Sequence, residues 1–242
     1  MAIRVVHFGL GPIGNAVVRQ VASRPGFKVV GAIDIDPDKV GRDVGLVAGV
    51  KRRLGAKVSA DAAATLRRSK PDVVVLCTSS SLRGITPQIE TILRARVPIV
   101  STTEELSYPV GSNVRWARKI DRLAKRAKAA VLGTGVNPGF TMDALPITLT
   151  GVCERVDRIE VDRIQDARTR RLPFQQKIGS GLTRAQFRKK VAEGTVRHVG
   201  LAESVTMVAD AMGWKLDRIV DRIKPKVASR RVSSRFLSVA AG

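Results

Sequence analysis

Aromatic residues and cysteines are scarce in this 242-residue chain. Aromatic residues make up 4% of the sequence, so the core must rest on valine, isoleucine, leucine and alanine, a composition that suits a parallel sheet covered by helices. The two cysteines, Cys77 and Cys153, lie far apart and lack the spacing of metal ligands. We therefore predict no metal site, and two reduced, semi-buried thiols in a reducing compartment.

Long hydrophobic runs are also missing. The N-terminus, MAIRVVHFGLG, places Arg4 and His7 inside a short apolar run, which is the pattern of neither a signal peptide nor a transmembrane segment. No later apolar run approaches the length that crosses a membrane. We predict a cytoplasmic protein without a membrane partner.

Acidic residues are few beside basic ones. The chain has 43 lysines and arginines against 21 aspartates and glutamates, a net charge of +22. Such an excess attracts polyanions, and nucleic acid is the first partner to consider. However, the basic residues are spread from Arg4 to Arg235, and aromatic residues do not alternate with them as in base-stacking surfaces. The pattern favours a solvated basic surface and no specific nucleic-acid partner.

The first 140 residues alternate between strand-like and helix-like segments. A β-branched run at 3–8, a glycine-rich turn, a helical pattern that stops at Pro25 and an apolar run at 27–36 form a βαβ unit. The alternation continues with helices at 61–69, 86–96 and 112–129, and with strands at 71–80, 97–103 and the beginning of 130–140. This predicts a Rossmann-type doubly wound parallel sheet with helices on both faces.

The rhythm changes beyond residue 140. Residues 155–167 alternate apolar and charged side chains, which is typical of an antiparallel strand with one wet face. Helices are predicted at about 183–193 and 202–214, followed by further strand-like segments. We therefore divide the chain into a dinucleotide-binding Rossmann domain, 1–140, and a smaller α+β domain, 141–242.

The turn GLGPIG at 9–14 is a dinucleotide-binding fingerprint. Gly9 allows the tight turn, Gly11 lets the backbone approach a pyrophosphate, and Gly14 lets helix and strand pack closely. The helix that begins around Pro12 and Ile13 presents free N–H groups to the phosphates. The turn follows a strand and opens a helix, so the pattern predicts NAD(H) or NADP(H) as the cofactor.

An acidic residue stands where the adenosine ribose is expected. Asp34 ends the second strand, 20 residues after Gly14, and its carboxylate favours NAD(H) because it repels a 2′-phosphate. Asp36 competes for the same role, and Lys39 and Arg42 lie near enough to leave NADPH open.

Thr78, Ser79 and Ser80 end a strand at the cofactor edge. They are predicted either to touch the diphosphate or nicotinamide ribose, or simply to turn the chain.

Two neighbouring carboxylates, Glu104 and Glu105, follow the strand at 97–103 in the stretch STTEELSYP. The carboxyl end of a parallel strand is where ligands bind in this architecture. A capping box is the structural alternative, because Ser101 and Thr102 each precede a glutamate by three residues. Adjacent side chains diverge, so one carboxylate is expected to face the nicotinamide, where burial would raise its pKa and fit it for proton exchange.

Five segments of the chain resemble one family. GLGPIGNAV, CTSS, STTEELSYP, GTGVNPGFTMDALP and GTVRHVGLAES resemble the 2,4-diaminopentanoate dehydrogenase family, which includes the native amine dehydrogenases and is related in fold to dihydrodipicolinate reductase. The resemblance covers essentially the whole chain, and T-x-E-E-L and GVNPGF are its most specific parts. It implies NAD(P)-dependent deamination of a small amine to a carbonyl and ammonia, or the reverse, in a homodimer.

The resemblance also implies roles for single residues. Glu104 becomes the acid/base, with Glu105 as runner-up. Asn137, Pro138 and Phe140 match the segment beside the nicotinamide, with Phe140 shaping a small apolar pocket or serving in the core. His198 is either a residue of the substrate pocket or a structural histidine.

Two departures bear on this resemblance. Dihydrodipicolinate reductases carry a paired-histidine motif with a nearby lysine, whereas this chain has only His7 and His198. An imine reductase of that type remains the alternative enzyme, and a non-catalytic dinucleotide sensor with a basic nucleic-acid-binding surface is the alternative outside enzymes. Members of the family usually continue well past the point where this chain ends, which implies a fragment.

Overall fold

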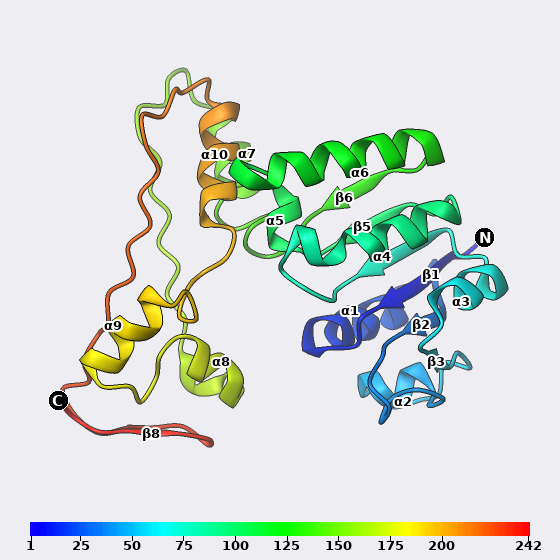
Figure 1. Cartoon of the computed structure of the whole chain (residues 1–242), viewed down its shortest axis with the longest axis horizontal. Helices are drawn as coiled ribbons and strands as arrows, with labels where there is room; N and C mark the ends of the chain where they lie inside the picture. The colour runs from blue at the N-terminus through cyan, green and yellow to red at the C-terminus, as the bar shows by residue number, and fades with distance from the viewer.

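A six-stranded parallel sheet organises the N-terminal part of the chain (Figure 1). The computed structural model describes residues 1–242 apart from the side chain of residue 112. The strand order is β3-β2-β1-β4-β5-β6, and every neighbouring pair is parallel. The strands are β1 (Ile3–Phe8), β2 (Phe27–Ile33), β3 (Val58–Ser59), β4 (Val73–Leu76), β5 (Ile99–Ser101) and β6 (Val131–Gly133). This order confirms the predicted Rossmann-type sheet, whose switch point lies between β1 and β4.

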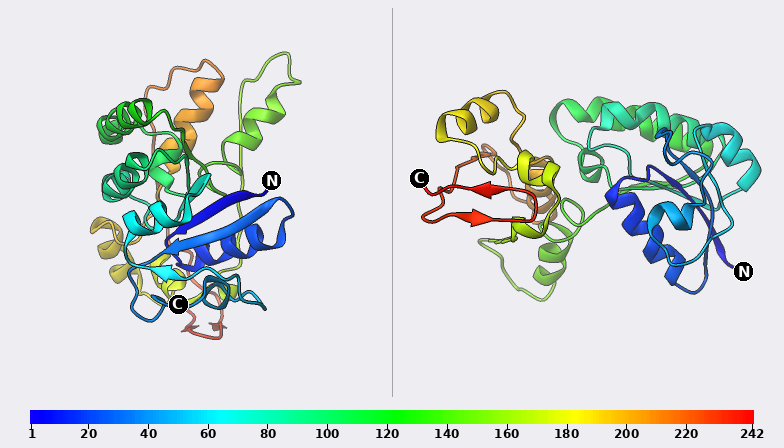
Figure 2. Two further views of the ribbon diagram at one scale, coloured as in Figure 1. Left: turned by 90° about the vertical axis from the view of Figure 1, so that its right-hand side faces the viewer. Right: turned by 90° about the horizontal axis from the view of Figure 1, so that it is seen from below.

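Helices cover both faces of the sheet (Figure 2). On one face, α1 (Pro12–Ser23) and α2 (Val44–Ala48) bury apolar side chains against β2 and β3, with Val18 at the centre. On the other face, α3 (Ala62–Ser69), α4 (Leu82–Arg94) and α6 (Val114–Ala127) pack over β1, β4 and β5. The two clusters are separate because the sheet divides them.

In helix α6, the apolar residues face the core and the basic residues face solvent. Ile120 is buried, and Ala124 and Ala127 pack against the same cluster, while Arg118 and Arg122 are exposed. The apolar stripe of this helix is the one that its spacing predicts.

The helix α4 begins earlier than the predicted 86–96. Ser81 caps it, because its hydroxyl oxygen accepts a hydrogen bond from the Gly84 N–H at 3.3 Å, and Pro87 is accommodated inside the helix. The predicted strands at 71–80 and 97–103 are likewise shorter, because their polar ends turn into loops.

The second part of the chain contains helices and one small antiparallel pair. Its elements are α7 (Ala144–Thr150), the 3-10 turn η2 (Ala167–Thr169), α8 (Leu172–Lys177), α9 (Arg184–Ala192), α10 (Leu201–Ala211), β7 (Val232–Ser233) and β8 (Ser238–Val239). α10 contacts both α7 and the short helix α5 (Glu104–Ser107) of the first part. The predicted α+β character is therefore present, and α9 and α10 lie where helices were predicted.

The antiparallel strand predicted at 155–167 is wrong. Within the described residues, no strand pairs with 155–166. The chain there runs as an extended segment without helix or strand (Figure 1). Ile164, which the alternation assigned to a buried face, is 95% exposed. Alternation predicts a strand only where another strand supplies hydrogen bonds, and none does. The strand-like segments expected after α10 reduce to β7 and β8 for the same reason.

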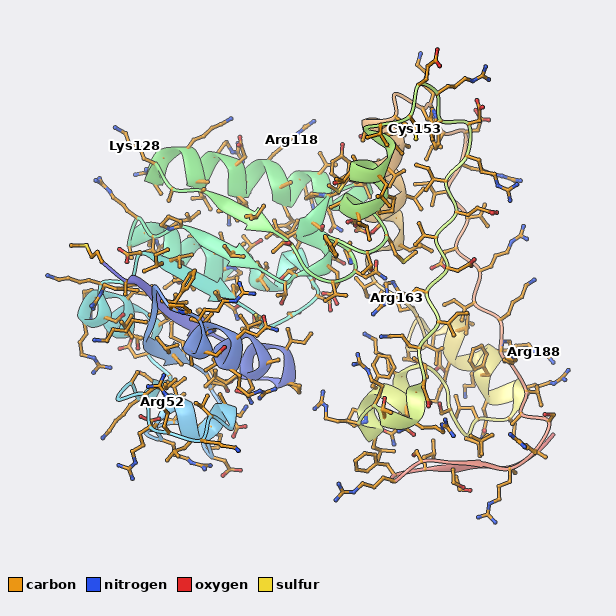
Figure 3. All side chains as sticks on the ribbon, turned by 180° about the vertical axis from the view of Figure 1, so that it is seen from behind. Arg52, Arg118, Lys128, Cys153, Arg163 and Arg188 are labelled. Atoms are coloured by element: carbon orange, nitrogen blue, oxygen red, sulfur yellow. The ribbon has the colours of Figure 1, made fainter. Side chains whose placement is uncertain are left out.

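The two thiols differ from each other. Cys77 is half-buried as predicted, and burial raises its pKa. Cys153, expected to be semi-buried, is exposed on the turn that follows α7 (Figure 3), because the missing strand leaves nothing to cover it. Among the described residues, no helix is long and apolar enough to cross a membrane.

Candidate functional site

The glycine turn between β1 and α1 lies at the carboxyl edge of the sheet. Gly9 has a φ of +92°, and a Cβ there would lie 2.6 Å from the carbonyl oxygen of Cys77. A Cβ on Gly14 would overlap the carbonyl oxygen of Gly9, whereas a Cβ on Gly11 would meet nothing within 4 Å. The first and last glycines are thus required by packing. The middle one keeps a space open, as the approach of a pyrophosphate needs.

The start of α1 offers hydrogen-bond donors at the same place. Gly11 is its N-cap and has no side chain to satisfy the first amide groups, and Pro12 lacks an N–H. The remaining N–H groups of the first turn have no intrahelical acceptor. The Ile13 side chain is 59% exposed beside them. This geometry fits an anion such as the diphosphate of a dinucleotide.

The Asp34 carboxylate stabilises the glycine turn by a hydrogen bond. Its Oδ2 accepts a hydrogen bond from the Leu10 N–H at 2.6 Å, and its Oδ1 accepts one from the Asp36 N–H at 3.0 Å. Lys39 Nζ lies 3.5 Å from Asp34 Oδ2 and 2.9 Å from Asp36 Oδ2. The hydrogen bond from Lys39 is the main cause that lowers the pKa of Asp36, and it raises the pKa of Lys39. The turn after β2 therefore presents both carboxylates and an ammonium.

Thr78, Ser79 and Ser80 follow β4 and make contacts that turn the chain. Thr78 Oγ1 donates to Gln88 Oε1 at 2.5 Å, and Ser79 Oγ accepts from the Ser81 N–H at 3.2 Å. The carbonyl oxygen of Ser80 accepts a hydrogen bond from the Glu105 N–H at 3.4 Å. These contacts account for the turn, and a cofactor contact remains a prediction for all three.

The two glutamates after β5 have different surroundings. Glu105 Oε2 accepts a hydrogen bond from the Leu82 N–H at 2.7 Å, so its carboxylate caps α4. Neither predicted capping box is formed. The Ser101 hydroxyl donates to the Leu76 carbonyl oxygen and to Thr103 Oγ1. The N-cap of α5 is Thr103, and its side chain makes no capping hydrogen bond. The two glutamates therefore differ in role, because the Glu105 carboxylate is bound to the start of α4, which lies earlier in the chain.

Glu104 faces the segment that precedes α10. A Cβ built on Gly200, which has a φ of +98°, would lie 3.3 Å from Glu104 Cβ and would overlap the ring of Pro138. Among the described residues, the Glu104 carboxylate has no hydrogen-bond or ion-pair partner. This carboxylate is half-buried and free for a ligand.

Asn137 and His198 meet beside it. Asn137 Nδ2 lies 3.4 Å from His198 Nε2, while Asn137 Oδ1 is buried without a partner among the described residues. Desolvation is the main cause that lowers the pKa of His198, the nearby Arg163 adds to it, and the negative charge of Glu104 acts in the opposite direction. Glu104, Asn137 and His198 thus share one neighbourhood.

Pro138 and Phe140 belong to the same turn but differ in exposure. Pro138 is buried against Gly200, whereas the Phe140 side chain is 53% exposed. Because it is exposed, Phe140 does not have the core role that was its structural alternative. Its ring instead presents an apolar surface beside the turn.

One site residue was missed from the sequence. Asp143 is fully buried, and its carboxylate accepts hydrogen bonds from the N–H groups of Gly139 and Ala144 and from Ser204 Oγ. It ties the turn of Asn137 and Phe140 to α10. The sequence did offer a clue, because an aspartate directly before the helical run ALPITLT is a typical N-cap.

Comparisons with known proteins find a match for each part of the chain. Residues 3–108 match the family described as dihydrodipicolinate reductase, N-terminus, and residues 140–242 match the 2,4-diaminopentanoate dehydrogenase C-terminal domain. The chain is 34% identical over 227 residues to a 2,4-diaminopentanoate dehydrogenase of Acetoanaerobium sticklandii, across 88% of this chain and 61% of that protein.

Two further relatives are amine dehydrogenases. One, from Streptomyces virginiae, is 24% identical across 97% of this chain and 66% of its own length. The structure of an amine dehydrogenase from Mycobacterium smegmatis matches 100% of this chain and 72% of that one, with a TM-score of 0.80 and 26% identity. The chain thus spans 61% to 66% of the two curated relatives described here.

Proposed function

We propose that this chain, which matches a dihydrodipicolinate reductase N-terminal model over residues 3–108 and a 2,4-diaminopentanoate dehydrogenase C-terminal model over residues 140–242, is an NAD(P)-dependent amine dehydrogenase. The reaction is oxidative deamination of a small amine to a carbonyl and ammonia, or the reverse reductive amination. The names of its relatives support an amine as the substrate.

NAD(H) or NADP(H), when bound, supplies hydride acceptance or donation at its nicotinamide ring. The open space at Gly11 and the free N–H groups at the start of α1 support binding of its diphosphate there. Asp34, or its rival Asp36, would meet the adenosine ribose. The other cofactor contacts proposed at this edge of the sheet come from Thr78, Ser79, Ser80 and Asn137. Lys39 offers a cation for a 2′-phosphate.

Glu104 is the acid/base in this proposal, and its contrast with Glu105 is the observation that carries it. Glu105 already accepts the Leu82 N–H, so protonation or binding of substrate there would compete with the cap. Glu104 is half-buried at the carboxyl end of β5 beside Gly200. Its carboxylate would take a proton from the ammonium or amine and hold a positively charged iminium close by.

Pro138, Phe140 and His198 form the substrate side of the site. The exposed Phe140 ring supplies an apolar contact, and His198 is mostly neutral near pH 7 because its pKa is lowered, so it does not repel an ammonium. A small apolar amine fits these properties.

The two alternatives have less support. A dihydrodipicolinate-type reductase would need paired histidines, but His7 is buried in β1 and His198 lies before α10. A sensor that binds nucleic acid would need an extended basic surface, whereas exposed cations such as Arg52, Arg118 and Arg188 project from distant elements (Figure 3). The basic residues that do gather, beside Trp116, line one small cleft.

We also place the domain boundary near residue 140, and we propose a cytoplasmic homodimer. The match that begins at residue 140 supports the boundary. The two free thiols, Cys77 and Cys153, are compatible with a reducing compartment. The family resemblance supports the homodimer, which light scattering on the purified chain would test.

The experiment is a turnover assay on the purified chain with NADH or NADPH, a high concentration of ammonium and a panel of small ketones and aldehydes. Oxidation of the reduced cofactor that requires both ammonium and carbonyl supports the proposal. Glu104→Gln should abolish it, and Glu105→Gln is the matched control, expected to keep turnover while lowering the melting temperature. Loss of turnover in Glu105→Gln alone would reverse the assignment, and cofactor binding without turnover in any mixture would favour the sensor.

A further inference from the structure

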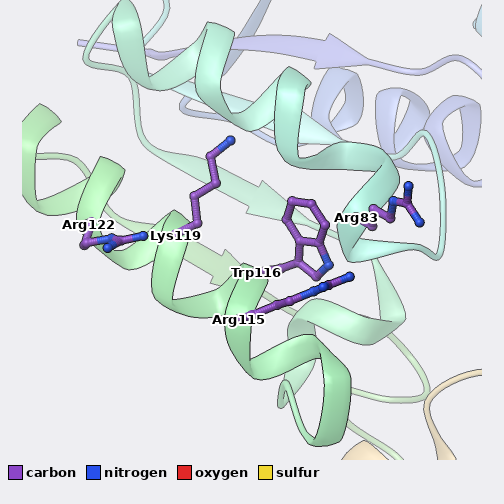
Figure 4. A pocket seen from close by; sticks show the side chains of 5 residues that line it. All are labelled: Arg83, Arg115, Trp116, Lys119 and Arg122. Atoms are coloured by element: carbon purple, nitrogen blue, oxygen red, sulfur yellow. The ribbon is translucent and has the colours of Figure 1, made fainter.

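A basic cleft lies between α4 and α6, outside every residue assigned to the cofactor or the amine. Its volume is about 340 Å³, and Arg83, Arg115, Trp116, Lys119 and Arg122 line it (Figure 4). We propose that this cleft binds a small polyvalent phosphate anion, such as inorganic triphosphate or the phosphate chain of a nucleotide. The proposal is independent of the dehydrogenase activity.

The spacing along α6 brings the cations to one side. Arg115, Lys119 and Arg122 occur at i, i+4 and i+7, so they form a single stripe on the helix. Like charges at this spacing repel one another and destabilise a helix. Arg83 extends from α4 on the other side of the cleft (Figure 4). An anion between the two helices would offset the repulsion among all four.

Few carboxylates neutralise the cleft. Arg83, Arg115 and Arg122 have no ion pair within the described part of the chain, and Lys119 has one, to Glu90 Oε2 at 3.6 Å. Glu90 is shared with Arg94, at 3.1 Å. Among the described residues, the four cations of the cleft therefore have one ion-pair partner, Glu90, which they share with Arg94, so the cleft carries an excess of positive charge.

The start of α6 adds to that positive charge. Arg83 and Arg115 are the second residues of α4 and α6, and neither first turn contains an acidic residue. The N-terminal end of a helix carries a partial positive charge, so an arginine there is unfavourable and an anion is favourable. At α4 the Glu105 carboxylate already accepts the Leu82 N–H at 2.7 Å, so of the two ends it is the start of α6, which has no side-chain cap, that contributes positive charge to the cleft.

Trp116 gives the cleft a firm wall. Its ring packs against the core cluster beneath α6, and the Arg115 guanidinium lies 5.1 Å from the ring centroid. Stacking restricts the guanidinium and leaves its N–H groups directed outward, a geometry that suits bidentate contacts to phosphate oxygens. The volume admits a small ligand, so a free polyphosphate fits better than a duplex nucleic acid.

The test is calorimetric titration of the full chain with sodium triphosphate at constant ionic strength. We expect saturable binding that weakens at least about tenfold in the double variant Arg83→Gln/Arg115→Gln. The matched control, Arg53→Gln/Arg188→Gln, removes two exposed cations outside α4 and α6 and should stay within about twofold of the native affinity. Circular dichroism would establish that both variants are folded.

Three results would overturn the proposal. These are absence of saturable binding, an equal loss in both double variants, and binding of a single-stranded oligonucleotide with none of triphosphate. An equal loss would mean that triphosphate binds through the overall charge of the surface. It could also bind at the glycine turn, which neither double variant changes. A second readout is tryptophan fluorescence, which triphosphate should change in the native chain and leave unchanged in Trp116→Phe, where Trp214 alone emits.

Discussion

The Asp143 carboxylate accepts a hydrogen bond from the Ser204 hydroxyl at 2.7 Å, and both residues are buried. One belongs to the turn before α7 and the other to α10. The same carboxylate holds the N–H groups of Gly139 and Ala144 at 2.8 and 2.6 Å. Through this one side chain, the turn that carries Asn137 is fixed to the helix that follows His198.

Loss of the Asp143 carboxylate should therefore loosen both elements together. We expect Asp143→Ala to lower the free energy of unfolding by roughly 2–4 kcal/mol, and Ser204→Ala by about 1–2 kcal/mol, because each leaves buried partners unsatisfied. Urea unfolding of the two single variants and the double variant measures their coupling. Strictly additive losses would mean that the hydrogen bond does not join the two elements.

Two glycines of the turn, Gly11 and Gly14, should respond differently to alanine. Gly11→Ala adds a methyl group where nothing lies within 4 Å, so the melting temperature should change little while dinucleotide affinity falls at least about tenfold. Gly14→Ala would overlap the Gly9 carbonyl oxygen and should cost roughly 2–4 kcal/mol of stability. Thermal melts and cofactor fluorescence measure both. Unchanged affinity in folded Gly11→Ala would remove the turn from the cofactor site.

Lys39 should decide how well NADPH is used. Its ammonium lies between Asp34 and Asp36, and a glutamine there would leave two carboxylates facing a 2′-phosphate. We expect Lys39→Gln to lower kcat/KM with NADPH by about fivefold or more relative to NADH. Lys28→Gln, on the exposed start of β2, is the control. An unchanged ratio would place the 2′-phosphate elsewhere.

His7 should make stability depend on pH. Its side chain is fully buried in β1, both ring nitrogens lack partners in the described part of the chain, and burial lowers its pKa from 6.5 to about 4. Between those pH values the unfolded chain binds a proton that the folded chain does not, so stability falls as the pH drops. The shift corresponds to about 3 kcal/mol in total.

The control for this effect is His7→Val, which removes the titrating group and places a β-branched residue, favoured in strands, at that position. Urea unfolding at several pH values between 4 and 7 should show a smaller slope in His7→Val than in the native chain. The comparison concerns the slope, because a smaller side chain also changes the packing at every pH. Parallel profiles would mean that other groups cause the acid loss.

The sequence predicted the first part of the fold better than the second. β1 is found at its predicted bounds, Ile3–Phe8, because glycine turns and continuous apolar runs are local features that a βαβ unit requires. Residues 155–167 failed because alternation says nothing about whether a partner strand is present. The helix predicted at 86–96 begins at Leu82 in the structure, where Ser81 is the cap.

The site shows the same division. The glycine turn and Asp34 lie within one local unit, so a cofactor role could be predicted for them from their spacing alone. Which of the two glutamates is free could not be read locally, because the answer depends on the Leu82 N–H, 23 residues earlier. For Asp143 only the N-cap role is local; its hydrogen bond with Ser204, 61 residues further along the chain, has no local signal. Contacts of this range belong to the folded molecule.

Gly200 has a consequence for the order in which the protein is made. The last strand of the sheet ends at Gly133, so a ribosome has released everything that the parallel sheet needs well before Gly200 emerges. Domains fold as units during synthesis, the N-terminal one first. The surface around Glu104 therefore stays exposed to solvent until Gly200 is synthesised and packs against Pro138. Translation thus separates in time the parallel sheet from the segment that covers Glu104.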